Sequence, residues 1–185
     1  MSRVEESELP PAHALYTPRQ RWGFLAILFL VSTSSYMDRQ IITIVLEPIK
    51  QELQVSDARL GMLTGFSFAL FYATLGLPVA RLADRANRRL IIGVALTIWS
   101  GFTLLCGFAQ GFWHLAFARV GVGAGEAGAI PPAQSLLADY FPPEQRGRAF
   151  GLFMMSAMAG YLVAFVGGSQ VAAAFGWRMA FVAVG

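Results

Sequence analysis

Two ionisable side chains stand inside an otherwise apolar stretch of this sequence. The stretch runs from Trp113 to Tyr140 and holds Arg119 and Glu126, seven residues apart. In an α-helix this spacing places both side chains on one face. An acid inside a stretch long enough to cross a bilayer indicates a functional site, because burying a charge in a membrane is costly. The alternative is a packing helix whose acid is neutralised by a neighbour.

The same stretch contains residues that interrupt a helix. Pro131 and Pro132 cannot donate the backbone hydrogen bonds due to Ala127 and Gly128, so we expect the helix to kink or open just after Glu126. The glycines around the acid favour close helix packing; they are Gly121, Gly123, Gly125 and Gly128. A buried acid beside opened backbone is the arrangement that transporters use at a binding site.

A second apolar stretch, Trp22–Leu46, carries two more charged residues, Asp38 and Arg39. Helical spacing places a set of polar residues on one face, with Asp38 at the edge of that face. The set is Ser32, Ser35, Arg39 and Thr43. We expect this polar stripe to face the interior of a helix bundle, toward water or a bound molecule, rather than lipid.

The composition is that of a membrane protein. Of the 185 residues, 56% are hydrophobic and 14% are charged, whereas about 25% are charged in a typical soluble domain. The charges lie in clusters between long apolar runs, so the net charge of +3 indicates membrane topology rather than nucleic-acid binding.

The sequence contains no set of residues typical of an enzyme, a metal site or an ATP-driven pump. It lacks a Gly-x-x-x-x-Gly-Lys-Ser/Thr phosphate loop, and no nucleophile–base set stands out. Cys106 is the single cysteine, and His13 and His114 are too scattered to indicate a metal site. We therefore expect neither an enzyme nor a cofactor.

The apolar runs predict an all-α integral membrane protein. Residues 1–21 form a polar tail, and residues 22–185 form the transmembrane bundle, with Pro48 closing the first helix. The predicted spans are about 22–46, 60–79, 89–109, 113–140 and 149–173, and a sixth begins at 175–185. Eleven residues cannot cross a bilayer, so we expect a six-helix bundle truncated in its sixth helix, as a fragment of a longer protein.

The distribution of lysine and arginine predicts the orientation in the membrane. Nine of these residues fall on the side of the amino terminus and of the 80–90 and 141–148 turns, and three fall on the other side. Because positive residues accumulate in the cytoplasm, we expect the amino terminus and both turns to be cytoplasmic, in a bacterial inner membrane.

The 80–90 turn reads ARLADRANRRL and resembles the loop between helices two and three of the major facilitator superfamily. That loop runs roughly G-x-L-a-D-R-x-G-R-R, and its charged positions match Asp84, Arg85, Arg88 and Arg89. Ala80 and Asn87 replace the two glycines, and Asn87 tolerates a left-handed backbone. Arg119-x-x-x-Gly123 and Gly176–Trp177–Arg178 are also similar to superfamily motifs. The matches extend from the first predicted helix to the sixth and imply the amino-terminal half of the fold.

Within the superfamily the sequence resembles the spinster-like branch. The resemblance rests on Tyr36–Met37–Asp38–Arg39 and on Gly125–Glu126, followed by Pro131, Ser135 and Asp139. It implies lipid-like substrates, such as lysolipids and sphingoid compounds, and proton coupling. The sequence departs from the family's antiporter pattern in helix five. That pattern would align on Ala159 to Gly168, and only Gly167 and Gly168 match it. The direction of coupling is therefore not predicted.

The resemblance carries the family's charged residues of helices one and four onto Asp38, Arg39 and Glu126. A buried acid beside an arginine can also change its charge, because burial favours the neutral acid and the arginine favours the carboxylate. Asp38 and Glu126 become the proton-coupling candidates, and Arg39 and Arg119 become counter-ions or anchors for an anionic substrate. A static structural ion pair is the alternative for these four residues. The loop residues Asp84, Arg85, Arg88 and Arg89 are interpreted as a conformational latch. The predicted function is a proton-coupled secondary transporter of an amphipathic lipid-like or organic anionic solute. A non-transporting membrane receptor or scaffold with the same fold is the alternative.

Overall fold

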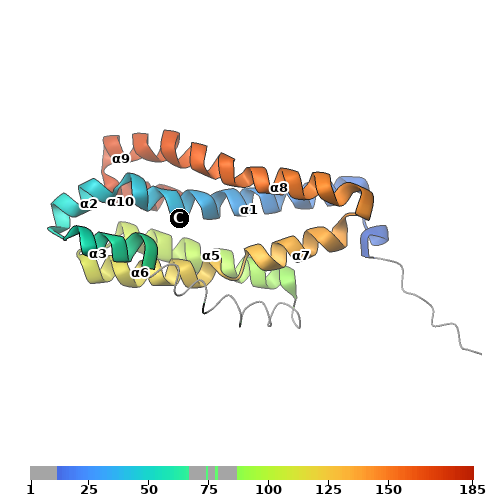
Figure 1. Cartoon of the computed structure of the whole chain (residues 1–185), viewed down its shortest axis with the longest axis horizontal. Coiled ribbons are helices and arrows are strands. Elements are labelled where there is room, and N and C mark those ends of the chain that lie inside the picture. Colours follow the sequence, from blue (N-terminus) through green and yellow to red (C-terminus); the bar gives the residue numbers. More distant parts are fainter. Residues whose placement is uncertain (1–11, 67–73, 75–77, 79–86) are drawn as a thin grey trace, which may run out of the picture.

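The computed structural model describes residues 12–66, 74, 78 and 87–185 of the chain (Figure 1). Every element in these ranges is helical, which confirms the all-α prediction. Most of the second predicted span, together with Asp84 and Arg85, lies outside the described residues.

The first long helix, α1, spans Pro18–Ile44. It begins before the predicted Trp22 because Thr17 caps it: the Thr17 hydroxyl accepts from the Gln20 backbone, and the Gln20 side chain accepts from the Thr17 backbone. A short 3₁₀ helix, η1 (Ala12–Leu15), precedes it within the predicted tail.

The chain does not leave the helical conformation at Pro48. A second helix, α2, spans Leu46–Leu53 directly after α1. Pro48 lies in its first turn, where the backbone N–H groups have no partner within the helix, so the missing donor does no harm. Gln54 then adopts a left-handed conformation with φ 51° and ends α2. The segment that follows the first predicted span is therefore helical as far as Leu53.

The next two elements begin the second predicted span. Helix α3 spans Asp57–Gly61 and is capped by the Ser56 hydroxyl, which accepts from the backbone of Arg59. A π-helical segment, η2 (Met62–Phe66), continues it.

The third predicted span forms α5, Arg88–Gly107. Asn87 would tolerate a left-handed backbone, but it adopts an extended one with φ −69°. Its side chain instead accepts hydrogen bonds from the backbone N–H groups of Arg89 and Leu90 and so caps the helix.

The fourth predicted span is divided into two helices. Helix α6 spans Phe112–Glu126, and α7 spans Ile130–Tyr140. Between them the backbone N–H of Gly128 donates to Gly125, and that of Ala129 donates to Glu126. These tighter bonds replace the regular helical pattern. Pro131 and Pro132 lie in the first turn of α7, where proline is tolerated.

The last part of the chain runs through four elements. Helix α8 (Pro143–Val163), the π-helical segment η3 (Ala164–Gly168) and α9 (Ser169–Phe175) follow without interruption. Gly176, with φ 85°, then turns the chain into α10 (Trp177–Val184). A side chain at Gly176 would be strained in this conformation, which explains the glycine.

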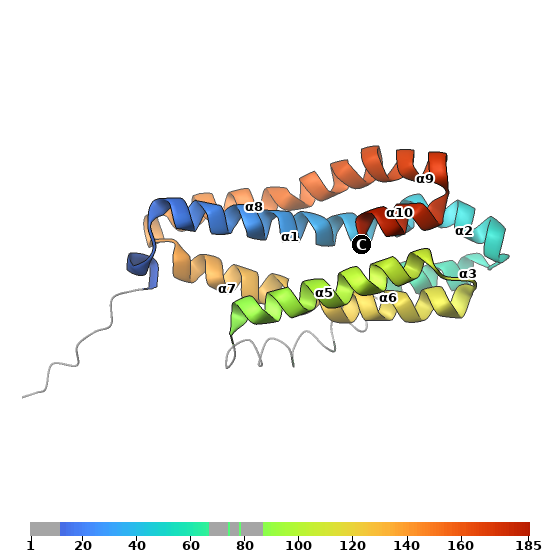
Figure 2. The ribbon, with the colours of Figure 1, turned by 180° about the vertical axis from the view of Figure 1, so that it is seen from behind.

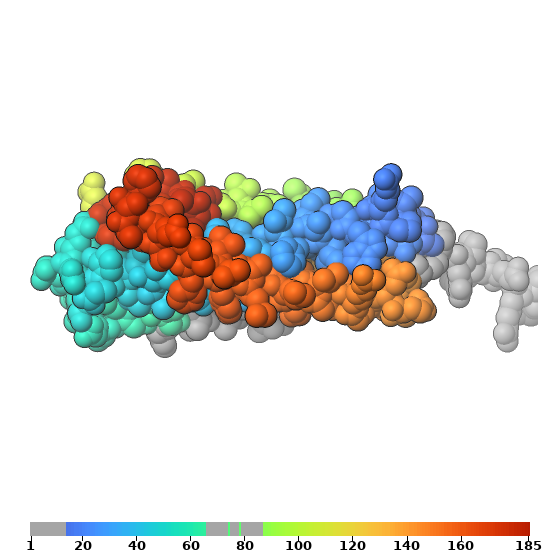
Figure 3. All heavy atoms as spheres, turned by 90° about the horizontal axis from the view of Figure 1, so that it is seen from above, coloured from blue at the N-terminus to red at the C-terminus, as the bar shows by residue number. Residues whose placement is uncertain are grey.

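The helices run along the long axis of the molecule, with α1 between α8 on one side and α5, α6 and α7 on the other (Figures 1 and 2). Figure 3 shows α8 lying along α1 on one face. Among the described residues, the 88–107 and 143–175 helices are long and apolar enough to cross a membrane.

Small residues allow α8 and η3 to approach α1 closely. They recur every fourth residue and are buried: Ser156, Gly160, Ala164 and Gly168. A Cβ atom on Gly160 would lie 2.7 Å from the carbonyl oxygen of Thr33, and the Ser156 hydroxyl donates to that of Ser32 at 2.7 Å. In a regular α-helix this spacing would rotate away from α1 by about 40° at each step. The wider π turn of η3 keeps Gly168 against Ile41.

The apolar core has two clusters, one toward each end of the bundle. On α1, Leu25 and Leu28 belong to the first cluster, and Ile41 and Ile42 belong to the second. The buried polar residues of α1, Ser32, Ser35 and Asp38, lie between these two apolar pairs. The candidate site therefore sits between two well-packed regions.

Candidate functional site

The buried face of α1 is polar in the middle of the helix. Ser32, Ser35 and Asp38 are each at most 1% exposed, and their spacing of three residues places them on one face. Helical spacing predicted Asp38 at the edge of the polar stripe and Thr43 on it, but Asp38 is fully buried and Thr43 is exposed. The buried face of α1 is therefore turned toward Asp38 relative to the predicted stripe. Ile41 and Ile42 continue this face into the apolar core.

Arg39 and Glu126 form an ion pair that joins α1 to α6. The Arg39 Nε atom lies 2.7 Å from Glu126 Oε2. Glu126 is the last residue of α6 and is fully buried, whereas the side chain of Arg39 is 28% exposed. The Arg39 guanidinium also lies 5.7 Å from the centre of the Tyr36 ring. The pair therefore has one buried partner and one partner that reaches the surface of this bundle.

Asp38 has different partners. Its Oδ1 atom accepts a hydrogen bond of 2.7 Å from the hydroxyl of Thr103 on α5. Arg119 of α6 donates to the backbone carbonyl of Asp38 at 3.4 Å. All three residues are at most 1% exposed. Thr103 was not predicted from the sequence, although it is a polar residue on the otherwise apolar face formed by Trp99 and Cys106.

The structure thus brings together the four charged residues that the sequence singled out: Asp38, Arg39, Arg119 and Glu126. One oxygen of each acid remains without a hydrogen bond among the described residues, namely Oδ2 of Asp38 and Oε1 of Glu126. A buried carboxylate oxygen without a donor is unfavourable. Each acid therefore has a position at which a proton can be taken up.

The close approach of α5 and α6 depends on the glycines beside Glu126. A Cβ atom on Gly125 would lie 2.7 Å from the backbone nitrogen of Trp99, and one on Gly121 would overlap the Phe102 ring. Glycine at these two positions is therefore required by packing, as is typical of membrane helices.

Two of the four predicted latch residues lie at the far end of α5 from Thr103. Arg88 forms an ion pair of 2.6 Å with Asp139 near the end of α7. Arg89 donates to the hydroxyls of Tyr16 and Tyr140, whose rings are stacked 4.3 Å apart. These contacts join α5 to α7 and to the segment before α1. Asp84 and Arg85 lie outside the described residues.

A second polar cluster ties the opposite end of the bundle together. Glu52 of α2 accepts hydrogen bonds from Trp177 Nε1 at 2.7 Å and from Arg178 Nη1 at 2.5 Å. Arg178 also donates to the carbonyl of Ala109, after α5, at 3.0 Å. The two hydrogen bonds hold the pKa of the Glu52 carboxyl below its usual value. The Gly176–Trp177–Arg178 motif was recognised in the sequence, but its acidic partner Glu52 was not predicted.

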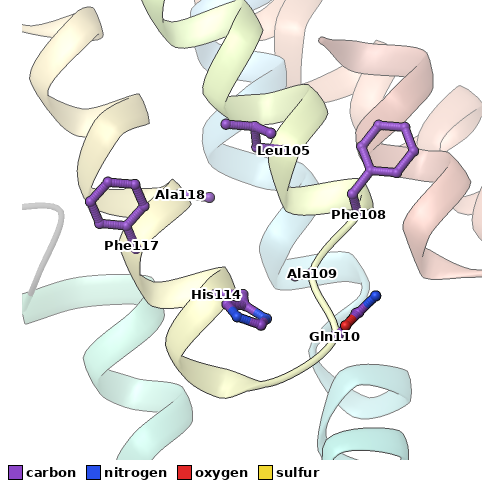
Figure 4. A pocket seen from close by; sticks show the side chains of 7 residues that line it. All are labelled: Leu105, Phe108, Ala109, Gln110, His114, Phe117 and Ala118. Atoms are coloured by element: carbon purple, nitrogen blue, oxygen red, sulfur yellow. The ribbon is translucent and has the colours of Figure 1, made fainter.

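A pocket of about 360 Å³ lies between α5 and α6, near the loop that joins them (Figure 4). Its lining is mostly apolar and includes Leu105, Phe108 and Phe117, with Gln110 and His114 as polar groups. Its lining does not include any of the four buried charged residues. We therefore place the candidate site at the buried charges rather than at this pocket.

A membrane-type helix bundle with charged side chains buried between its helices is the architecture of a transporter. Residues 28–185 match the Major Facilitator Superfamily, and the chain belongs to this family. Its members are transporters and not enzymes, which confirms the prediction from the sequence that this chain is not an enzyme.

Three similar proteins refine the assignment. An MFS-type efflux pump of Mycolicibacterium smegmatis is 38% identical over 91% of this chain and 39% of its own length. A probable L-galactonate transporter of Escherichia coli is 30% identical, over 87% of this chain and 35% of its own length. The crystal structure of a bacterial homolog to the human lysosomal transporter spinster, inward-facing and unoccupied, has a TM-score of 0.83 and 37% identity.

The alignment with the spinster homolog covers 91% of this chain and 41% of that chain. It confirms the spinster-like resemblance. The chain spans about two fifths of the length of these relatives.

Proposed function

We propose that the full protein is a proton-coupled secondary transporter and that Asp38 and Glu126 carry the exchanged proton. The observation that supports this most strongly is the pair of fully buried acids, each with one oxygen that lacks a hydrogen-bond donor among the described residues. Burial favours the neutral acid, and a neighbouring arginine favours the carboxylate. A group under these opposing influences changes its protonation when access to water changes.

Glu126 is the better candidate for the group that responds to substrate. Its partner Arg39 is 28% exposed and is the member of the pair that reaches the surface of the bundle. When Glu126 takes up a proton, it no longer balances the charge of Arg39. An anionic group of the substrate then takes over that role, so proton and substrate are bound at adjacent positions.

A static ion pair in a non-transporting receptor or scaffold is the alternative. A static pair needs satisfied partners, because a buried charge without them destabilises the fold. The unbonded oxygens of Asp38 and Glu126 do not favour it. A scaffold also gains nothing from charge in the middle of a span.

We further propose an amphipathic anion as the substrate. The guanidinium of Arg39 is suited to a carboxylate or phosphate head group. The Tyr36 ring lies beside this guanidinium and packs edge-on against the Tyr161 ring. The spinster-like resemblance supports a lipid-like tail. A polar organic anion is the second candidate, since one relative is a probable L-galactonate transporter.

The proposed orientation places the amino terminus and the Arg88–Asp139 contact at the cytoplasmic face of a bacterial inner membrane. There, Arg88 and Arg89 with the loop before them would act as the latch. The ion pair and the tyrosine contacts at this end support a position at which helices are held together.

The test uses the full-length protein reconstituted into liposomes with a pH gradient. The transported probes are a radiolabelled anionic lysophospholipid, lysophosphatidylglycerol, and galactonate. Glu126→Gln keeps the shape of the side chain but removes its titration, and we expect it to abolish gradient-driven transport. Glu144→Gln, at an exposed position in the first turn of α8, is the matched control and should transport normally. Gradient-driven transport by Glu126→Gln at the wild-type rate would refute the role of Glu126.

A further inference from the structure

Thr103 makes a hydrogen bond that its position on a helix does not require. Threonine in a helix commonly donates to the carbonyl oxygen four residues earlier. Thr97, which precedes Thr103 on the same helix, donates to Gly93 at 3.0 Å, and Thr64 donates to Leu60 at 3.2 Å. Thr103 instead donates across the bundle to Asp38 Oδ1 at 2.7 Å.

The surroundings of Thr103 hold this contact in place. Thr103 and Asp38 are both fully buried, so water does not compete for the hydroxyl. Gly125 packs against the backbone of Trp99, one turn before Thr103, and fixes the separation of α5 and α6. Arg119 of α6 donates to the backbone carbonyl of Asp38 and so ties the same residue to a second helix.

We propose that Thr103 is a positioning residue for Asp38, and that its hydroxyl sets the pH range in which the transporter works. The hydrogen bond stabilises the carboxylate relative to the protonated acid, and it holds Oδ1 toward α5. This leaves Oδ2 as the oxygen that takes up a proton, and Oδ2 is the atom without a hydrogen bond among the described residues. The inference rests on the proposed proton coupling.

Other charged and titratable groups also act on Asp38, and they define what the test must hold constant. They are Glu126 and Arg119 on α6, Arg39 on α1 and Cys106 on α5. None of them is changed in the variants below. Thr103 differs from these groups because it has no charge and does not titrate, so a shift on its removal reports the hydrogen bond.

The variants are Thr103→Val, Thr103→Ser and Thr97→Val in the full-length protein. Valine keeps the shape of threonine and removes the hydroxyl, whereas serine restores it. Thr97→Val removes a hydroxyl that bonds only within α5 as far as the described residues show, so it controls for the loss of a threonine from the same helix. The first readout is the pH profile of lysophosphatidylglycerol or galactonate transport.

A second readout does not depend on the substrate. Infrared difference spectra of the protein in membranes follow the C=O band of protonated carboxyl groups during a pH titration. The band of Asp38 is identified by its loss in Asp38→Asn. Failure of transport with both probes therefore leaves the hydrogen bond testable.

We expect Thr103→Val to move the midpoints of the transport pH profile and of the infrared titration about one to two pH units toward higher pH. This shift corresponds to the typical strength of a hydrogen bond to a charged group. Thr103→Ser should lie close to the wild type, and Thr97→Val should coincide with it. An unchanged infrared midpoint in Thr103→Val would overturn the inference, even if Glu126→Gln abolishes coupling. Equal shifts in Thr103→Val and Thr103→Ser would also overturn it, because they would reflect altered packing. If wild-type transport does not respond to pH, the proposed function is wrong. The proposal that the Thr103 hydroxyl sets the working pH range is then wrong as well.

Discussion

Gly125→Ala tests the packing that holds the candidate site together. A Cβ atom at this position would lie 2.7 Å from the nitrogen of Trp99, 2.9 Å from its Cβ and 3.1 Å from its Cα. Ordinary contacts begin near 3.4 Å, so α5 and α6 must separate by about 0.7 Å at this point. The neighbouring atoms are mostly backbone and cannot turn aside. Overpacking of this kind costs about 1–3 kcal/mol.

Gly101→Ala is the matched control on α5. A Cβ atom there would meet no other atom within 4 Å, and alanine favours a helix over glycine by about 0.5–1 kcal/mol. We therefore expect Gly125→Ala to lower the free energy of unfolding and Gly101→Ala to leave it unchanged or to raise it. The assay is equilibrium denaturation of the full-length protein in mixed micelles. The reasoning is wrong if Gly125→Ala is as stable as the wild type.

Two further predictions concern the ends of the bundle. The pKa of Glu52 is held below its usual value. The contribution of this carboxylate to stability is therefore fully present above the usual pKa and is lost as the pH falls through the lowered pKa. We expect this contribution to be less than about 1 kcal/mol, since the side chain is half exposed. Denaturation midpoints should therefore fall more between pH 7 and acidic pH in the wild type than in Glu52→Gln, and equal pH dependence in both would count against the contact. For the orientation, cysteines at Asn87 and Gln145 in intact cells should resist a membrane-impermeant thiol reagent, while one at Asp57 reacts; labelling of the first two without lysis would reverse the proposed topology.

The sequence allowed the charged residues to be located but not their pairing. Helical periodicity places Arg119 and Glu126 on one face, yet the structure joins Glu126 to Arg39 and Arg119 to the backbone of Asp38. Pairing depends on how the helices are rotated about their axes. This rotation is set by packing contacts such as that of Gly125 on Trp99, and a periodicity argument does not contain it.

Other features depended on local geometry that one sequence does not reveal. Pro48 could have ended α1, but its place in the first turn of α2 makes it compatible with a helix. Asn87 was predicted to tolerate a left-handed turn and instead caps α5. Thr103 and Glu52 were missed because a single polar residue at a buried or terminal position carries no spacing signal. Their importance comes from partners that are distant in the sequence.

The central claim is that buried acids couple proton movement to substrate movement, and proton flux tests it most directly. Liposomes that contain the full-length protein and a pH-sensitive dye would be given lysophosphatidylglycerol or galactonate without an imposed gradient. The wild type should change the internal pH as substrate moves, and Glu126→Gln should not. Substrate movement by the wild type without a change of internal pH would contradict the account.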